Sequence, residues 1–304
     1  MVRKINFLLG IFFFIGISSF LRTIIIAWDS HLLDFSIFYY AGQSALQKLN
    51  PYIDQRLFTQ ASYPPFTFLF TMLFSLMPFA IASKIWTSLS VFSFLVGLYI
   101  LSRITQISQN KARILFTLSV VSFPFKFTIG MGQINLILLF TLILSIYFIS
   151  QKRRIASLFL SFAILMKLFP VVLLPAFILK HKYSYVKETV FITLFIVLIS
   201  WTYFGSEIYT YYIKNILIPI IFVPAGSVYY NQSITGLFAR ASIPGIFLFV
   251  ARVTLVIISF TNIIKKNFSL NSCLSIILTL VILINSFSWQ HYFINNSFLF
   301  FVFN

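Results

Sequence analysis

Apolar runs of about twenty residues recur along this chain of 304 residues, with few charges inside them. A helix of that length spans the hydrocarbon core of a bilayer. The chain is 60% hydrophobic and 9% charged, whereas soluble domains carry roughly a quarter charged residues. No water-soluble core could absorb so much apolar surface, and long continuous runs favour helices over a barrel. The sequence therefore predicts an all-α, polytopic membrane bundle.

Basic residues dominate the charge and raise the formal net charge to +17. More than half of the 22 Lys and Arg residues lie in short clusters between the apolar runs. This placement is typical of cytoplasmic loops, and it argues against a nucleic-acid partner, which would need a basic groove interleaved with exposed aromatics. The clusters are Arg3 and Lys4; Arg103, Lys111 and Arg113; Lys152, Arg153 and Arg154; Lys180, Lys182 and Lys187; and Lys265 and Lys266.

Residues 28–65 form a polar window that holds three of the five acidic residues, Asp29, Asp34 and Asp54. The run over 5–27 before it predicts a first span that leaves the cytoplasm. The apolar spacing over 35–49, interrupted by polar residues, predicts a helix lying on the outer membrane surface. A chain this apolar that gathers its carboxylates in one window is expected to carry out its chemistry there.

Together with the run over 5–27, the remaining apolar runs predict about nine to eleven membrane helices in a single domain over 1–304, with a cavity expected on the outer face. Spans are expected at 64–82, 86–102, 114–129, 135–150, 189–204, 244–264 and 274–287, with an outer loop over 205–232 and a further descent beginning at 293. The run over 155–179 is expected to break between Lys167 and Pro170. Three apolar runs lie between Asp34 and Gln133, and three crossings would put these residues on opposite sides of the membrane. The basic clusters, however, place both residues on the outer side. One run therefore does not cross, and the candidate is 114–129, which contains Pro124 and Lys126.

The charged candidates each allow a functional and a structural interpretation. Asp34 could deprotonate a hydroxyl at the membrane surface, or it could cap the helix that follows it. Lys167 could hold a lipid phosphate at a helix break, or it could snorkel to the interface. Lys126, Arg240 and Arg252 are weaker candidates of the phosphate-binding kind.

The amide and histidine candidates are also open to two interpretations. Gln133 and Asn135 could bind sugar hydroxyls or belong to a loop and helix cap. Asn231 and Gln232 could do the same, although Asn231 also fits a glycosylation acceptor. His291 could orient a substrate or belong to the interfacial aromatic belt. The isolated histidines do not predict a metal site.

Taken in order, several motifs resemble glycosyltransferase family 87 of the GT-C superfamily, which contains bacterial polyprenyl-phosphate-mannose-dependent mannosyltransferases and their relatives. The resemblance spans nearly the whole chain. The motifs are Asp34-Phe35, Tyr39-Tyr40-Ala41-Gly42, Asn50-Pro51-Tyr52, Tyr63-Pro64-Pro65, Gly132-Gln133-Ile134-Asn135, Lys167-x-x-Pro170, Asn231-Gln232-Ser233 with Gly236 and Arg240, and Ser288-Trp289-Gln290-His291.

This resemblance implies an inverting hexosyltransferase of the cell membrane, with its active site on the extracytoplasmic side. The donor would be a hexose, with mannose favoured, on a polyprenyl phosphate, and the acceptor an envelope glycan or lipid. Asp34 would be the general base, and Lys167 with Arg240 would bind the donor phosphate. No cofactor and no obligatory metal are implied. The residues implied to bind substrate are Tyr40, Tyr63, Gln133, Asn135, Asn231, Gln232 and His291.

The resemblance has one departure: family members continue through further spans after the Trp-x-His motif, whereas this chain ends within its last predicted helix. We therefore expect a truncated or minimal copy. The alternative functions are a non-catalytic flippase for lipid-linked sugars, an accessory membrane subunit, or a degenerate remnant. No internal repeat of the kind found in many transporters is evident, which ranks the flippase lower.

Overall fold

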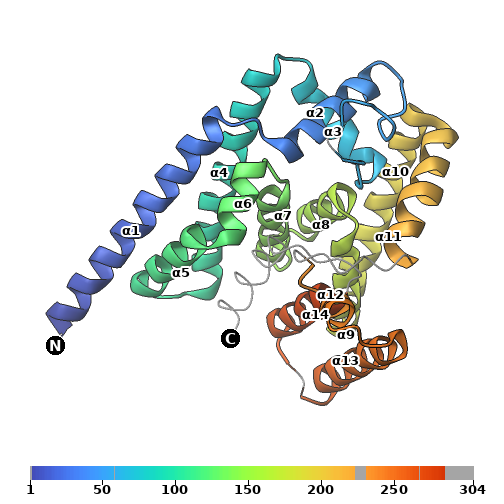
Figure 1. Cartoon of the computed structure of the whole chain (residues 1–304). Helices are drawn as coiled ribbons and strands as arrows, with labels where there is room; N and C mark the ends of the chain where they lie inside the picture. Colours follow the sequence, from blue (N-terminus) through green and yellow to red (C-terminus); the bar gives the residue numbers. More distant parts are fainter. Residues whose placement is uncertain (1, 58, 223–230, 267, 285–304) are drawn as a thin grey trace.

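A computed structural model describes residues 2–57, 59–222, 231–266 and 268–284 (Figure 1). Every secondary-structure element in these ranges is a helix, which confirms the all-α prediction. The elements are α1 (Val2–Asp29), α2 (Leu33–Leu46), α3 (Pro65–Ser75), α4 (Phe79–Thr105), α5 (Gln109–Val121), α6 (Phe123–Met131), α7 (Asn135–Phe148), α8 (Arg153–Met166), η1 (Phe169–Leu173), α9 (Leu174–Leu179), α10 (Tyr183–Tyr211), η2 (Tyr212–Leu217), α11 (Ile218–Phe222), α12 (Ile234–Arg240), α13 (Gly245–Lys265) and α14 (Leu270–Ile284).

Several helices are long and apolar enough to cross a membrane, so the chain is a polytopic helical membrane protein. Within the described residues there are four such segments, or five if α5 and α6 count as one bent span. This number is below the expected nine to eleven, because some predicted spans are apolar helices of only 10–17 residues. The four segments are Phe7–Asp29, Phe79–Thr105, Tyr183–Ile220 and Gly245–Lys265.

The span predicted over 64–82 is wrong, because α3 ends at Ser75 and is too short to cross a bilayer. Pro78 separates it from α4 and forms the N-cap of that 27-residue helix. Instead of spanning, α3 packs tightly on α2. The Ser75 hydroxyl donates to the Tyr39 carbonyl at 2.7 Å. A Cβ atom added at Gly42 would lie 2.4 Å from that same hydroxyl, so only glycine permits this approach.

The run over 114–129 is broken, as its proline predicted. The helices α5 and α6 meet at an angle of 59°. Ser122 lies at the bend, where its side chain accepts from the Phe125 amide and caps α6, which begins with Pro124 in its first turn. Counting α5 and α6 as one broken span gives two crossings between Asp34 and Gln133. The bend is equally compatible with the re-entrant loop predicted over 114–129.

The helix predicted to lie on the membrane surface, over 35–49, is instead packed inside the protein as α2. Phe35, Phe38 and Ala41 are fully buried. Ser36 and Ile37, which point to the other sides of the helix, are buried as well, and a helix that is buried on all sides is not an amphipathic surface helix.

The outer loop predicted over 205–232 is helical as far as Phe222. The chain does turn at Gly205, which has a φ of +78° inside α10. After that turn the helix folds back, because the Tyr209 hydroxyl donates to Ser200 at 2.8 Å. Nine residues of straight helix would separate these positions by roughly 13 Å. The chain therefore reverses direction on a single glycine.

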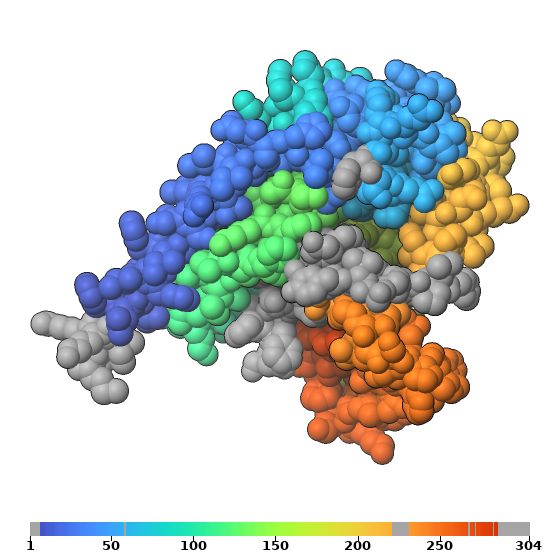
Figure 2. Space-filling view, in the orientation of Figure 1, coloured from blue at the N-terminus to red at the C-terminus, as the bar shows by residue number. Residues whose placement is uncertain are grey.

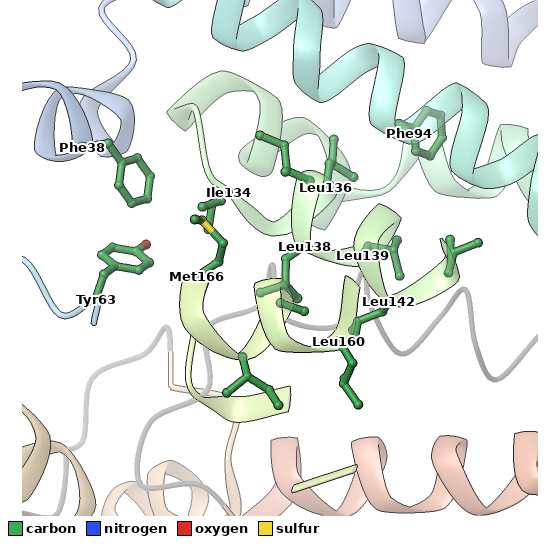
Figure 3. Close-up of a cluster of buried hydrophobic side chains, with 14 of the residues drawn as sticks. Phe38, Tyr63, Phe94, Ile134, Leu136, Leu138, Leu139, Leu142, Leu160 and Met166 are labelled. Atoms are coloured by element: carbon green, nitrogen blue, oxygen red, sulfur yellow. The ribbon is translucent and has the colours of Figure 1, made fainter. Parts of the chain in front are cut away.

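A buried apolar core lies directly beside the residues singled out from the sequence. Figure 3 shows Ile134 and Met166 side by side, with Phe38 and Tyr63 across from them. Ile134 and Met166 are fully buried, and the rings of Phe38 and Tyr63 lie 4.6 Å apart. Because Ile134 stands between Gln133 and Asn135, and Met166 precedes Lys167, the core anchors the backbone of all three polar residues.

Candidate active site

Asp34 lies in the first turn of α2, and its carboxylate accepts a hydrogen bond from the Gln133 side chain. The N-cap of α2 is Leu32, which makes no side-chain cap bond. The capping interpretation of Asp34 is therefore not what the structure contains. The position still suits a negative charge, because the helix dipole is favourable there.

A chain of hydrogen bonds links Asp34 to Lys167 through two amides. The Lys167 ammonium donates to the Asn135 side-chain oxygen at 3.2 Å. The Asn135 amide donates to the Gln133 side-chain oxygen at 3.3 Å, and Gln133 donates to Asp34. All three bonds run in one direction, from cation to carboxylate, so each polarises the next. We call Asp34, Gln133, Asn135 and Lys167 the amide relay.

Gln133 is positioned by the turn between α6 and α7. Gly132 ends α6 with a φ of +70°, in the left-handed region that favours glycine. A Cβ atom there would lie 2.7 Å from the Cβ atom of Phe35. The buried Trp86 indole donates to the Gly132 carbonyl at 2.8 Å. The end of α6 is thereby held against the start of α2, which brings Gln133 to Asp34.

Lys167 is positioned by the predicted helix break, which the structure confirms. Lys167 has an extended backbone at the C-terminus of α8, and Pro170 opens the short helix η1. The last carbonyls of a helix lack partners within it. Here the Thr67 hydroxyl lies 3.2 Å from the Leu165 carbonyl and 3.0 Å from that of Met166. Contact with α3 therefore holds the backbone from which Lys167 extends.

Burial acts on both charged ends of the amide relay. It raises the pKa of Asp34, and the hydrogen bond from Gln133 and the charge of Lys167 partly offset this effect. Burial also lowers the pKa of Lys167 to about 7, against the opposing influence of the Asp34 charge. The raised pKa of Asp34 suits a proton acceptor, and the lowered pKa of Lys167 makes its charge sensitive to pH near 7.

The two tyrosine candidates have different surroundings. The Tyr63 ring lies 5.9 Å from the Lys167 ammonium, at the outer limit of a cation–π contact. Tyr40 lies instead under the Arg56 guanidinium at 5.0 Å. Arg56 pairs with Asp54 at 2.6 Å and donates to Gln43 at 2.8 Å. This second cluster ties the segment after α2 back onto that helix.

The candidates near α12 form a local hydrogen-bonded cluster. The Arg240 guanidinium donates to the Asn231 backbone carbonyl at 2.7 Å, and the Asn231 side chain accepts from the Ser233 hydroxyl at 2.7 Å. Gln232 lies between Asn231 and Ser233 in the chain. In Figure 1, α12 lies well apart from α2, beside α13 and α14. His291 lies outside the described residues.

Sequence reasoning missed Trp86 and Thr67, which hold the two halves of the amide relay. Both are buried, and a buried indole or hydroxyl needs a hydrogen-bond acceptor. The sequence feature that could have identified both residues is a polar group inside a long apolar run. In the described part of the chain, no three His, Cys, Asp or Glu side chains gather into a metal site.

Comparison with known proteins identifies the family. No curated protein matches the chain at a significant level. The family model of glycosyltransferase family 87 matches residues 61–285, which is most of the chain. This span contains Gln133, Asn135 and Lys167, while Asp34 precedes it and joins them through the hydrogen bond from Gln133. The chain therefore belongs to glycosyltransferase family 87.

Proposed function

We propose that the protein transfers a hexose, with mannose the first candidate, from a polyprenyl-phosphate donor to an envelope glycan or lipid acceptor. The amide relay carries this proposal, since it joins one half-buried acid and one half-buried cation through hydrogen bonds in a glycosyltransferase. Glycosyl transfer from a phosphate needs both: a base for the attacking hydroxyl and a cation for the leaving phosphate.

In the proposed reaction, an acceptor hydroxyl attacks the anomeric carbon of the donor sugar as Asp34 takes its proton. The new bond joins the acceptor oxygen to the anomeric carbon, and the bond from that carbon to the phosphate oxygen breaks. The electron pair leaves with the polyprenyl phosphate, which gains one negative charge. Lys167 stabilises that charge, and the configuration at the anomeric carbon inverts.

The arrangement of helices supports an extracytoplasmic site. α1 runs from the Arg3 cluster toward α2, and α4 runs from α2 to Arg103. α7 runs from Asn135 toward Lys152, and α8 returns from Arg153 to the break at Lys167. α1 and α4, which are long enough to cross a membrane, thus lie between a basic cluster and the end of the bundle that holds α2 (Figure 1), and α7 and α8, with 14 residues each, connect the amide relay to the Lys152 cluster. Because basic loops favour the cytoplasm, the amide relay belongs to the opposite face.

Substitution of Asp34 tests the proposal. Asp34→Asn removes the proton acceptor and keeps the hydrogen-bonding shape, so we expect transfer from a polyprenyl-phosphate hexose to fall by roughly 10²–10⁴-fold. The matched control is Asp29→Asn, because Asp29 is an exposed carboxylate five residues away. The measurement is radiolabelled product formed by membranes supplied with donors carrying different hexoses.

Two outcomes would contradict the proposal. Normal transfer by Asp34→Asn would remove Asp34 from the mechanism. Transfer that proceeds from a nucleotide sugar, and not from any lipid-linked sugar, would remove the proposed donor class.

A further inference from the structure

A groove of about 700 Å³ lies on the outside of the bundle, away from the amide relay. It runs between α1 and the bent pair α5–α6, which lie side by side in Figure 2. The residues of α1 that line it follow one stripe of the helix, at spacings of three and four. The lining residues are Phe14, Ile15, Ser18, Ser19, Arg22, Thr23, Ile26, Val121, Lys126 and Gly130.

Two cations face each other across this groove, Arg22 on α1 and Lys126 on α6, with no acidic residue in the lining. Both side chains are exposed. Within the described ranges, neither cation forms a salt bridge. Two cations beside a membrane-facing apolar wall are costly without an anion. The positive charges of Arg22 and Lys126 therefore favour a negatively charged ligand in the groove.

The bend between α5 and α6 opens the groove. On the α5 side of the bend, α1 and α5 touch closely, because a Cβ atom at Gly16 would lie 2.6 Å from the Thr117 hydroxyl. On the α6 side of the bend, a Cβ atom at Gly130 would meet no atom within 4 Å. Apolar side chains such as Phe14 and Ile15 line the lower part, so an acyl chain can lie along it below a headgroup at the cations.

We infer that the groove binds an acidic phospholipid, whose phosphate sits between Arg22 and Lys126 and whose acyl chain follows α1 past Ile15. Basic pockets between membrane helices are typical sites for such headgroups. This inference is independent of the proposed reaction.

The donor lipid is excluded as the occupant by distance along the helices. Arg22 lies seven residues before Asp29, and Lys126 seven residues before Gln133, so the cations are roughly 10 Å from the level of the amide relay. In a polyprenyl-phosphate sugar the phosphate is bonded directly to the reacting carbon. A donor held at Arg22 and Lys126 could not place that carbon beside Asp34.

The test measures lipid retention by native mass spectrometry of the full chain, delipidated and then supplied with phosphatidylglycerol or phosphatidylcholine. We expect one phosphatidylglycerol to bind at least tenfold more tightly than phosphatidylcholine. Arg22→Gln combined with Lys126→Gln should weaken phosphatidylglycerol binding about tenfold for each cation removed. The control pair Lys111→Gln and Lys187→Gln removes the same charge from exposed sites outside the groove.

A second variant keeps the cations and obstructs the groove. Ser18→Trp places a large side chain in the groove lining, and it should also displace phosphatidylglycerol. Thermal unfolding of each variant separates lost binding from lost folding. Equal binding of both lipids, full retention by the double variant, or displacement by polyprenyl phosphate in place of phospholipid would each overturn the inference.

Discussion

Two amide side chains set the separation between the acid and the cation of the amide relay. Gln133 donates to Asp34 and accepts from Asn135, which in turn accepts from Lys167. Each amide thus uses a donor and an acceptor, and a hydrocarbon side chain could replace neither function. At the residue scale, the reactivity of Asp34 and Lys167 therefore depends on residues that need not touch a substrate.

Removing the middle of the amide relay should impair transfer without removing a charge. In Asn135→Leu, Lys167 and Gln133 each lose one hydrogen bond, and a hydrogen bond to a charged group contributes about 1.5–3 kcal/mol. We expect kcat for hexose transfer to fall about tenfold or more, with membrane insertion preserved. Gln151→Leu is the control, because Gln151 is an exposed amide at the other end of α7. Unchanged kcat in Asn135→Leu would separate the amide relay from catalysis.

The pKa shifts predict a narrow, bell-shaped dependence of transfer on pH. The proposed reaction needs Asp34 without its proton and Lys167 with one. Because the Asp34 pKa is raised, Asp34 gains its proton at pH values above the ordinary aspartate range. Activity should therefore begin to fall there as the pH is lowered. Because the Lys167 pKa is about 7, activity should also fall as the pH rises past 7. The measurement is kcat/KM across pH 4–10.

The variant Lys167→Arg tests the assignment of the alkaline limb. Arginine stays protonated throughout this range, so activity above pH 7 should be retained relative to the maximum, even if the maximum is lower. An alkaline limb that stays near pH 7 in Lys167→Arg would assign that ionisation to another group.

At the scale of elements, the turn between α6 and α7 is the structural basis of the amide relay. Gly132 combines a left-handed backbone with a close approach to Phe35. Trp86 reaches the same turn from α4. Three elements that are far apart in the chain therefore meet at one glycine.

Gly132→Ala should disrupt this meeting point. A left-handed backbone is strained for alanine, and the added Cβ atom would overlap Phe35, so we expect a loss of about 2 kcal/mol or more of stability. The control is Gly130→Ala, two residues earlier, where the Cβ atom meets open space. Alanine there should be neutral or stabilising, since it favours the helix. Thermal midpoints in detergent compare the two, and equal midpoints would contradict the role of Gly132.

The elements also show what the sequence could predict. The break at Lys167 was predictable because Pro170 acts locally. The short helix α3 was not, because the apolar run over 64–82 looks like a span; apolarity alone does not distinguish a buried helix from a lipid-facing one. The helical return after Gly205 was missed for a related reason, since its polar residues and prolines resemble a loop.

On the scale of the whole molecule, the contacts that build the amide relay join residues distant in sequence. Gln133 and Asp34 are 99 residues apart, and Lys167 and Asn135 are 32 apart. Local spacing left Asp34 open to the capping interpretation, and only the order of the motifs suggested that these residues meet. The resemblance also included Arg240, which donates to the Asn231 carbonyl just before α12.

Accessibility labelling should test the orientation of the bundle. In a background with Cys273→Ala, single cysteines replace Ile53, which is 61% exposed between α2 and α3, or the exposed Gln151 between α7 and α8. We expect a membrane-impermeant maleimide to label Ile53→Cys in intact cells, and Gln151→Cys only after permeabilisation. The reverse pattern would place the amide relay on the cytoplasmic face.

Ile134 separates the two amides of the site by a single position, and its side chain is sealed in the apolar interior. Any outward shift of Gln133 or Asn135 would have to pull that isoleucine free, which resembles creating a core cavity and costs several kcal/mol. Under the proposed function we therefore expect the amide relay to act as a stiff template: sugar and acceptor would adapt their poses to it, and selectivity would depend on which molecules already fit.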